Sequence, residues 1–84
     1  MLRVLYFASV REAIGVGEEL IDAPPEVATV DALVDWLSTT SDAHRAAFAD
    51  RSRLRAAVDG RFVSVDALLA EAAEVALFPP VTGG

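Results

Sequence analysis

The chemistry that this sequence can offer is concentrated at its end, in the free carboxylate of Gly84, which follows Gly83. A carboxylate resists nucleophilic attack because its negative charge repels nucleophiles and oxide is a poor leaving group. Adenylation removes both obstacles, since the mixed anhydride that it forms releases AMP. A sulfide or persulfide can then attack to give a thiocarboxylate, whereas an amine gives an amide. Either reaction requires the terminus to enter another protein's active site.

The residues before the two glycines favour such an arm. Pro79 and Pro80 cannot continue a sheet ladder, so the strand before them is expected to end near Phe78. The backbone beyond them is biased toward extended conformations, and residues 80–84 would reach about 16 Å at roughly 3.3 Å each. The glycines carry no side chain that would obstruct a narrow channel. We therefore expect a domain over residues 1–79, followed by an extended tail of Pro80, Val81, Thr82, Gly83 and Gly84.

Other reactive groups are scarce. The chain holds one histidine, His44, and no cysteine, so neither a nucleophile–base pair nor a zinc cluster can be drawn. His44 falls in a polar segment and is expected to be a solvated surface residue. Gly15-Val16-Gly17 is too short for a phosphate-binding loop. We therefore expect no catalysis by this chain alone, no metal site and no bound cofactor. The ATP needed for adenylation would be used by a separate activating enzyme.

Composition narrows the class of protein. The 84 residues, 54% of them hydrophobic, are enough for one small domain. The net charge of −6 argues against a nucleic-acid partner and suits a basic protein partner. All seven basic residues are arginine, so no lysine side chain could accept an isopeptide bond. No apolar run is long enough to span a membrane and no secretory signal is visible, so a soluble cytoplasmic protein is expected.

Five segments are predicted to be strands, because they are rich in β-branched and aromatic residues or adjoin turn signals. They are residues 2–8, 16–23, 54–59, 61–64 and 74–78. The first two are expected to pair as a hairpin, and Asp59-Gly60 predicts a tight hairpin turn between the third and fourth. Period-two alternation gives an inward set of Leu2, Val4, Tyr6, Leu54, Ala56, Val58, Val75 and Leu77.

One helix dominates the prediction. Thr29 is its expected N-cap, and its apolar stripe consists of Val30, Leu33, Val34 and Leu37. A helical turn at residues 9–14, a more polar helix at 42–50 and a brief helix at 67–70 complete the elements. A strand–helix–strand crossover flanked by hairpins predicts an α+β fold, with a mixed sheet of four to five strands and one main helix packed on one face.

The opposite face of this sheet would carry apolar side chains that little in the chain can cover. They are Leu5, Phe7, Phe62 and Phe78. Exposed, contiguous aromatic side chains usually mark a partner surface. We expect this face to dock the protein that receives the tail, which leaves from the same edge.

Three stretches resemble one known family. Residues 4–12, VLYFASVRE, resemble its VLFFAxVRE opening; residues 56–59, AAVD, resemble its AAVN segment; and residues 74–84, EVALFPPVTGG, resemble its EVAxFPPVTGG ending. This is the small subunit of molybdopterin synthase (MoaD type), a sulfur carrier with the ubiquitin-like β-grasp fold. The similarity extends over nearly the whole chain.

The resemblance implies a function and partners. In this family an enzyme of the ubiquitin-activating type adenylates the terminal glycine, which is then sulfurated to a thiocarboxylate. The tail inserts into the large synthase subunit and donates sulfur to cyclic pyranopterin monophosphate, and two donations build the molybdopterin dithiolene. Carried over, Gly84 bears the sulfur and Gly83 gives it clearance. The positions that match partner contacts are Phe7, Phe62, Phe78 and, with a less defined role, Arg11.

Two turns depart from the family pattern. Residues 71–74, EAAE, stand where the family has a tight D-G-D-E turn and favour helix, and Asp59-Gly60 replaces an Asn-led turn. Other functions also remain open. A carrier for thiamine or cysteine synthesis uses the same fold and terminus, although thiamine-type carriers are typically shorter and lack the two prolines. A protein modifier would join Gly84 to lysines of other proteins, and a binding module with an inert tail would need no Gly84.

Overall fold

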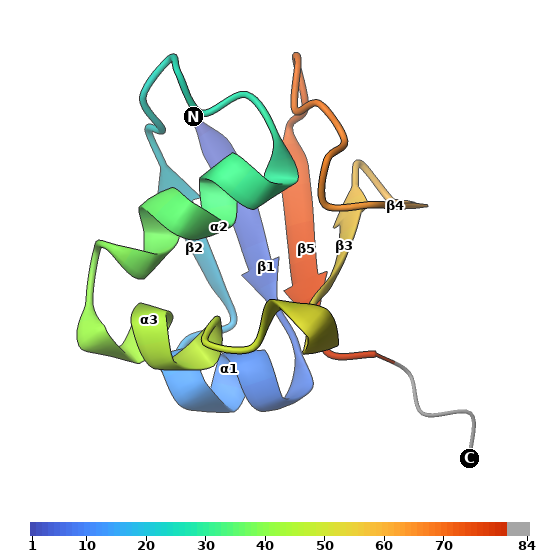
Figure 1. Cartoon of the computed structure of the whole chain (residues 1–84). Helices are drawn as coiled ribbons and strands as arrows, with labels where there is room; N and C mark the ends of the chain where they lie inside the picture. The colour runs from blue at the N-terminus through green and yellow to red at the C-terminus, as the bar shows by residue number, and fades with distance from the viewer. Residues whose placement is uncertain (81–84) are drawn as a thin grey trace.

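Five strands form one mixed sheet in the computed structural model, which describes residues 1–80 (Figure 1). The strand order is β2-β1-β5-β3-β4. The strands are β1 (Leu2–Tyr6), β2 (Glu18–Ile21), β3 (Arg55–Val58), β4 (Arg61–Val63) and β5 (Glu74–Phe78). The neighbouring strands β1 and β5 run parallel, and the other neighbours pair antiparallel. The predicted hairpin of the first two strands is confirmed.

The helical elements gather on one face of this sheet (Figure 1). They are α1 (Ala8–Ile14), α2 (Val30–Ser38), α3 (Asp42–Ala47) and the 3₁₀ helix η1 (Arg51–Arg53). The predicted stripe of α2 is fully buried, as are the sheet residues beneath it: Val4, Tyr6, Val75 and Leu77. A mixed sheet with its principal helix on one face confirms the expected β-grasp arrangement.

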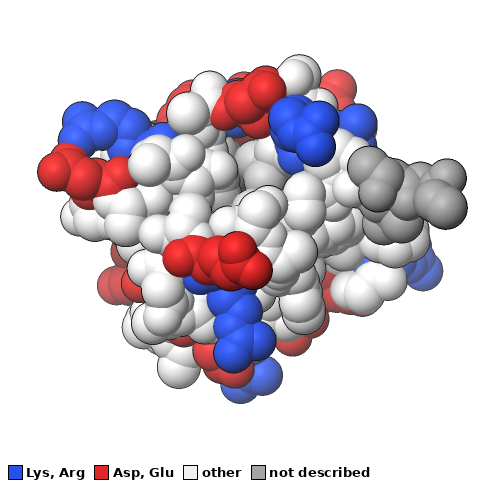
Figure 2. All heavy atoms as spheres, turned by 90° about the horizontal axis from the view of Figure 1, so that it is seen from below, with Lys and Arg blue, Asp and Glu red and all other residues white. Residues whose placement is uncertain are grey.

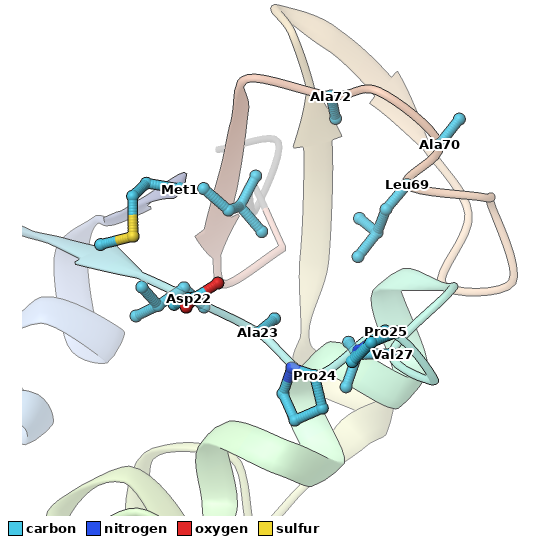
Figure 3. Close-up of a pocket in the computed structure, with 11 residues that line it drawn as sticks. Met1, Asp22, Ala23, Pro24, Pro25, Val27, Leu69, Ala70 and Ala72 are labelled. Atoms are coloured by element: carbon cyan, nitrogen blue, oxygen red, sulfur yellow. The ribbon is translucent and has the colours of Figure 1, made fainter.

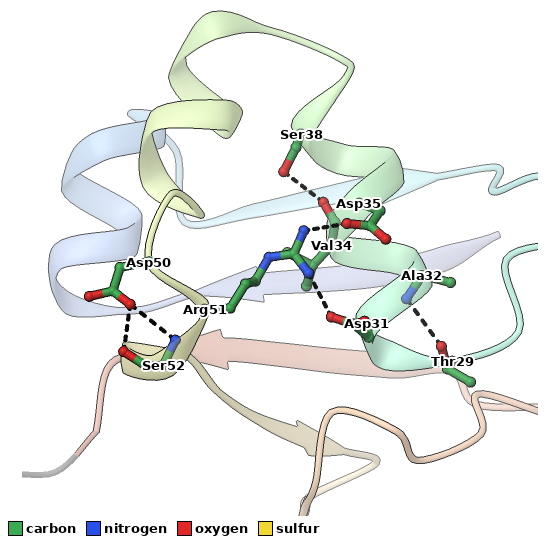
Figure 4. Close-up of polar contacts among 9 residues, drawn as sticks. All are labelled: Thr29, Asp31, Ala32, Val34, Asp35, Ser38, Asp50, Arg51 and Ser52. Carbon is green, nitrogen blue, oxygen red and sulfur yellow. Dashed lines mark hydrogen bonds and ion pairs between the residues drawn. The ribbon is translucent and has the colours of Figure 1, made fainter.

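The N-terminus of α2 is held by two kinds of acceptor. Thr29 is the N-cap, as expected, and its hydroxyl accepts a hydrogen bond from the Ala32 N–H at 3.1 Å (Figure 4). The first two N–H groups of the helix, those of Val30 and Asp31, donate to the carbonyls of Ala67 and Val65 respectively. After a turn at residues 65–66, this pairing draws residues 67–69 into an extended strap, so the brief helix predicted at residues 67–70 is wrong.

The Asp59-Gly60 hairpin turn is confirmed, with φ values of 49° and 83° at its two central residues. The Asp59 carboxylate also reaches across to the start of β5, where Oδ1 accepts from the N–H groups of Ala73 and Glu74 at 3.0 Å each. These bonds satisfy the N–H groups of Ala73 and Glu74, and the Ala72 N–H donates to the Leu69 carbonyl, so residues 71–74 form a turn. The expectation that this stretch favours helix is therefore wrong, for a reason that lies far away in sequence.

The connection from α3 to β3 is tied to α2 by one arginine. Arg51 of η1 places Nη1 2.6 Å from Asp31 Oδ1 and Nη2 2.5 Å from Asp35 Oδ1, both on α2 (Figure 4). The Asp50 side chain accepts from the Ser52 N–H at 3.1 Å and begins η1. Asp50 therefore starts a new element, and the polar helix predicted to reach residue 50 ends at Ala47.

Candidate functional site

The last strand ends where the two prolines predict. β5 stops at Phe78, and Pro79 and Pro80 follow as half-buried residues. Pro79 borders a hollow of about 210 Å³ that Val10 of α1, Ala46 of α3 and neighbouring side chains also line. The rest of the expected tail, Val81, Thr82, Gly83 and Gly84, lies outside the described residues.

The sheet face opposite the helices carries an apolar row that crosses four strands. In register, Leu5 of β1 is paired with Ala76 of β5, Ala76 with Ala57 of β3, and Ala57 with Phe62 of β4. Paired residues share a face, and the two alanines keep the middle of the row flat. We call the surface made by Leu5, Ala57, Phe62, Ala76 and Phe78 the outer face.

Two aromatic rings meet on the outer face. The ring centroids of Phe62 and Phe78 are 5.8 Å apart with 59° between the ring planes, a tilted geometry favourable for aromatic pairs. Phe62 is 84% exposed and Phe78 is half-buried. Phe7, 48% exposed, directly follows β1, and its N–H donates to the Leu77 carbonyl beside Phe78. The structure therefore brings the three predicted phenylalanines to the same end of the sheet.

Arg11 lies elsewhere. Its guanidinium passes over Gly17, where an added Cβ would be 3.4 Å from Arg11 Nε. Gly17 precedes β2, which forms one edge of the sheet, whereas Phe62 lies on β4 at the other edge. The structure thus separates Arg11 from the phenylalanine pair, and the two can contact a common partner only if that partner spans the sheet.

A polar cluster on the helix side corrects the expectation for His44. The His44 ring is buried, and its Nε2 lies 2.6 Å from Oε1 of Glu19, which also accepts from the Tyr6 hydroxyl at 2.7 Å. Nδ1 of His44 lies 2.6 Å from the Ser41 hydroxyl. The prediction of a solvated His44 is wrong, because α3 turns this side chain toward Tyr6 and Glu19 of the sheet. Sequence alone gave no signal, since Glu19 lies 25 positions away.

Burial and hydrogen bonding set the protonation states in this cluster. Burial raises the pKa of the Tyr6 hydroxyl far above its usual range, and the neighbouring Glu19 carboxylate acts in the same direction. Burial also acts to raise the pKa of Glu19. The hydrogen bonds from His44 and Tyr6, with the His44 charge, outweigh it and hold that pKa below its ordinary value. Tyr6 thus stays a hydrogen-bond donor and Glu19 an acceptor, and the cluster helps to stabilise the fold.

Outside these groups, the described residues carry mixed surface charge (Figure 2). Figure 2, which views the end of the molecule where β5 stops, shows positive and negative side chains interspersed. Within residues 1–80, no three His, Cys, Asp or Glu side chains are grouped to hold a metal ion, and no helix could cross a membrane. A hollow of about 300 Å³ lies at the other end of the sheet, where Met1, Pro24 and Leu69 line it (Figure 3).

Comparison with known proteins places this architecture. The model of the ThiS family matches residues 4–84. The chain belongs to the ThiS family. A molybdopterin synthase sulfur carrier subunit from Escherichia coli (strain K12) is 43% identical over 84 residues, and one from Haemophilus influenzae is 34% identical; both matches cover all of both chains. The resemblance read from the sequence is therefore confirmed.

Solved structures agree with the ubiquitin-like fold of this ThiS-family chain. A protein described as molybdopterin converting factor, subunit 1, from Pyrococcus furiosus superposes with a TM-score of 0.72 at 35% identity, covering 95% of this chain and 97% of that one. SAMP1 from Haloferax volcanii superposes with a TM-score of 0.71 at 27% identity, covering 99% and 98%. A second structure, described as small archaeal modifier protein 1 from the same organism, superposes with a TM-score of 0.70.

One residue beside the site escaped the sequence reasoning for this ThiS-family chain. Arg55 begins β3 and stands in register with Phe78 of β5, so it borders the aromatic pair on the outer face. The alternation that predicts Leu54 and Ala56 as inward leaves Arg55 outward, yet an outward arginine is normally only a solvated one. Its position became informative when the strand order put β3 beside β5.

Proposed function

We propose that this chain is the sulfur carrier subunit of a molybdopterin synthase, with Gly84 as the residue that carries the sulfur. The observation that carries the proposal is the end-to-end match to a sulfur carrier subunit at 43% identity, with neither chain extending beyond the other. The strand that stops at Phe78 before two prolines supports it, because a tail rooted there starts at the edge of the domain.

The proposed chemistry begins with activation. In the active site of an enzyme of the ubiquitin-activating type, the Gly84 carboxylate attacks the α-phosphate of ATP. This step forms an acyl–adenylate and releases pyrophosphate. Sulfide then attacks the acyl carbon, the bond to AMP breaks, and the thiocarboxylate remains. Where the nucleophile is a persulfide, the product is an acyl disulfide, and a thiol must reduce its S–S bond to release the thiocarboxylate and form a new disulfide. In the large synthase subunit, this sulfur passes to cyclic pyranopterin monophosphate, and two donations complete the dithiolene. The chain itself binds no cofactor in this scheme, which runs in the cytoplasm.

The outer face is the proposed docking surface for the large subunit and the activating enzyme. Phe62 is 84% exposed on a folded domain, which leaves a large apolar side chain without cover from residues 1–80. Exposed aromatic residues of this kind become the anchors of protein interfaces. The face also ends beside Pro79, so a partner bound there lies next to the root of the tail.

Mass spectrometry tests the proposal directly. The chain is co-expressed with its activating enzyme, and the C-terminal peptide should show one oxygen of Gly84 replaced by sulfur. A matched variant without Gly84 should show no such replacement and should not support molybdopterin synthesis in a reconstituted system. A chain that supports synthesis while its terminus is never sulfurated would rule the proposal out.

One alternative has a specific observation in its favour. The structural similarity to small archaeal modifier protein 1, measured by TM-score, is nearly as high as that to the converting-factor subunit. Conjugation through Gly84 is therefore the second candidate. Conjugation predicts a ladder of higher-mass amide adducts that resists thiol reagents. A thiamine or cysteine carrier would instead co-purify with a thiazole synthase or a cysteine-forming enzyme in place of a large synthase subunit.

A further inference from the structure

Arg55 is held in one orientation by the backbone around it. Its Nη1 donates to the carbonyls of Ser52 and Leu54 at 3.0 and 2.9 Å. Nη1 carries two hydrogens, so these two bonds use both of them. The Nη2 and Nε hydrogens remain, and they form the fork that binds a carboxylate through two parallel hydrogen bonds. The guanidinium is therefore already positioned as a carboxylate receptor.

The position of this guanidinium matters because of its neighbours. Arg55 stands opposite Phe78 in the β3–β5 register, and Phe78 packs on the exposed Phe62. Three other arginines, Arg3, Arg45 and Arg51, lie in ion pairs with carboxylates of this chain. Among residues 1–80, no carboxylate lies within ion-pair distance of Arg55.

We propose that the partner docked on the outer face places an Asp or Glu carboxylate on Arg55, at the rim of an apolar pocket that receives Phe62. This inference rests on the function proposed above, with the large synthase subunit as the partner. The chain carries a net charge of −6, so an acidic group on the partner needs a local cation, and Arg55 is one that the backbone holds in place beside Phe78. Arg55 thereby sets the register of docking, because charge pairs at a rim favour one orientation and speed its formation.

Binding of the large subunit to charge variants tests the inference. Affinity is measured at low and at high salt for the wild type, Arg55→Glu, Arg55→Gln and Arg55→Lys. We expect Arg55→Glu to weaken binding at low salt by about tenfold or more, because like charges then meet at the rim. The difference should narrow at high salt through screening. Arg45→Glu is the matched control, since it changes the net charge equally from an exposed position on α3, and it should bind as the wild type does.

The remaining variants keep the test decisive. Arg55→Gln removes the charge without adding a new one, so it serves if Arg55→Glu lowers the melting temperature, and it should still weaken binding severalfold. Arg55→Lys should bind more weakly than the wild type, because an ammonium has no fork; equal affinity would overturn the bidentate contact. If the wild type binds the large subunit and Arg55→Glu binds it with the same affinity, the inference is overturned and the proposed function stands. No binding of the wild type would instead contradict the proposed function.

Discussion

His44 and Glu19 join the short helix α3 to the edge strand β2 through a contact of 2.6 Å between Nε2 and Oε1. The same carboxylate oxygen accepts from the Tyr6 hydroxyl, so one acceptor serves two donors from two elements. In a chain of 84 residues, where the core is small, we expect such a cluster to contribute a sizeable share of stability.

Replacing Glu19 by alanine should lower the free energy of unfolding. Two buried or half-buried donors, on Tyr6 and His44, would lose their acceptor, and each orphaned donor costs about 1–3 kcal/mol. Because the Glu19 side chain is 33% exposed and water can partly replace it, we expect about 1–2 kcal/mol in total, measured by urea denaturation. Glu18→Ala on the same strand is the control and should change stability by no more than about 0.5 kcal/mol.

The stabilising effect of Glu19 should also depend on acid. Its pKa in the folded chain lies below the ordinary value of 4.5, so the unfolded chain takes up the proton first. The stabilisation is therefore complete above pH 4.5 and is lost as the pH falls toward the folded-state pKa. The difference in unfolding free energy between the wild type and Glu19→Gln should shrink as the pH is lowered through this range. A difference that stays constant would contradict it.

The contribution of Tyr6 to stability should depend on pH in the opposite direction, at alkaline pH. Its folded-state pKa is raised above the ordinary value of 10.0, so its contribution is complete below pH 10 and is lost as the pH rises further. Tyr6 is the single tyrosine, and the chain has neither cysteine nor lysine. The wild type should therefore lose stability above pH 10, whereas Tyr6→Phe should keep a nearly constant unfolding free energy there. An equal loss in both proteins would place the alkaline sensitivity elsewhere.

Asp59 combines a local and a distant role, and two substitutions separate them. Asp59→Asn tolerates a φ of 49° and keeps an oxygen to accept from Ala73 and Glu74, so it should change stability by under about 0.5 kcal/mol. Asp59→Ala loses both hydrogen bonds and holds alanine at positive φ, for a total of about 2–3 kcal/mol. Thermal melting checks both. Equal melting temperatures of the two variants would show that the carboxylate contacts contribute nothing.

These residues show what the sequence could and could not predict. The stripe of α2, the Thr29 cap and the Asp59-Gly60 turn depend on neighbours a few positions away, so local patterns were enough to predict them. The turn at residues 71–74 and the burial of His44 depend on partners 14 to 25 positions away. The aromatic members of the outer face were predicted because alternation assigns faces, but the place of Arg55 beside Phe78 required the strand order.

Phe62 gives the sharpest test of the outer face. Phe62→Asp should leave the domain folded, because the side chain is 84% exposed, so its melting temperature should stay near that of the wild type. Binding to the large subunit should weaken by about 2 kcal/mol or more, roughly thirtyfold, since a buried aromatic anchor would be replaced by an unpaired charge. Leu68→Asp is the control, at a 70% exposed leucine of the strap on the helix side. If both variants bind as the wild type does, the large subunit docks elsewhere; if both weaken equally, added negative charge alone explains the loss.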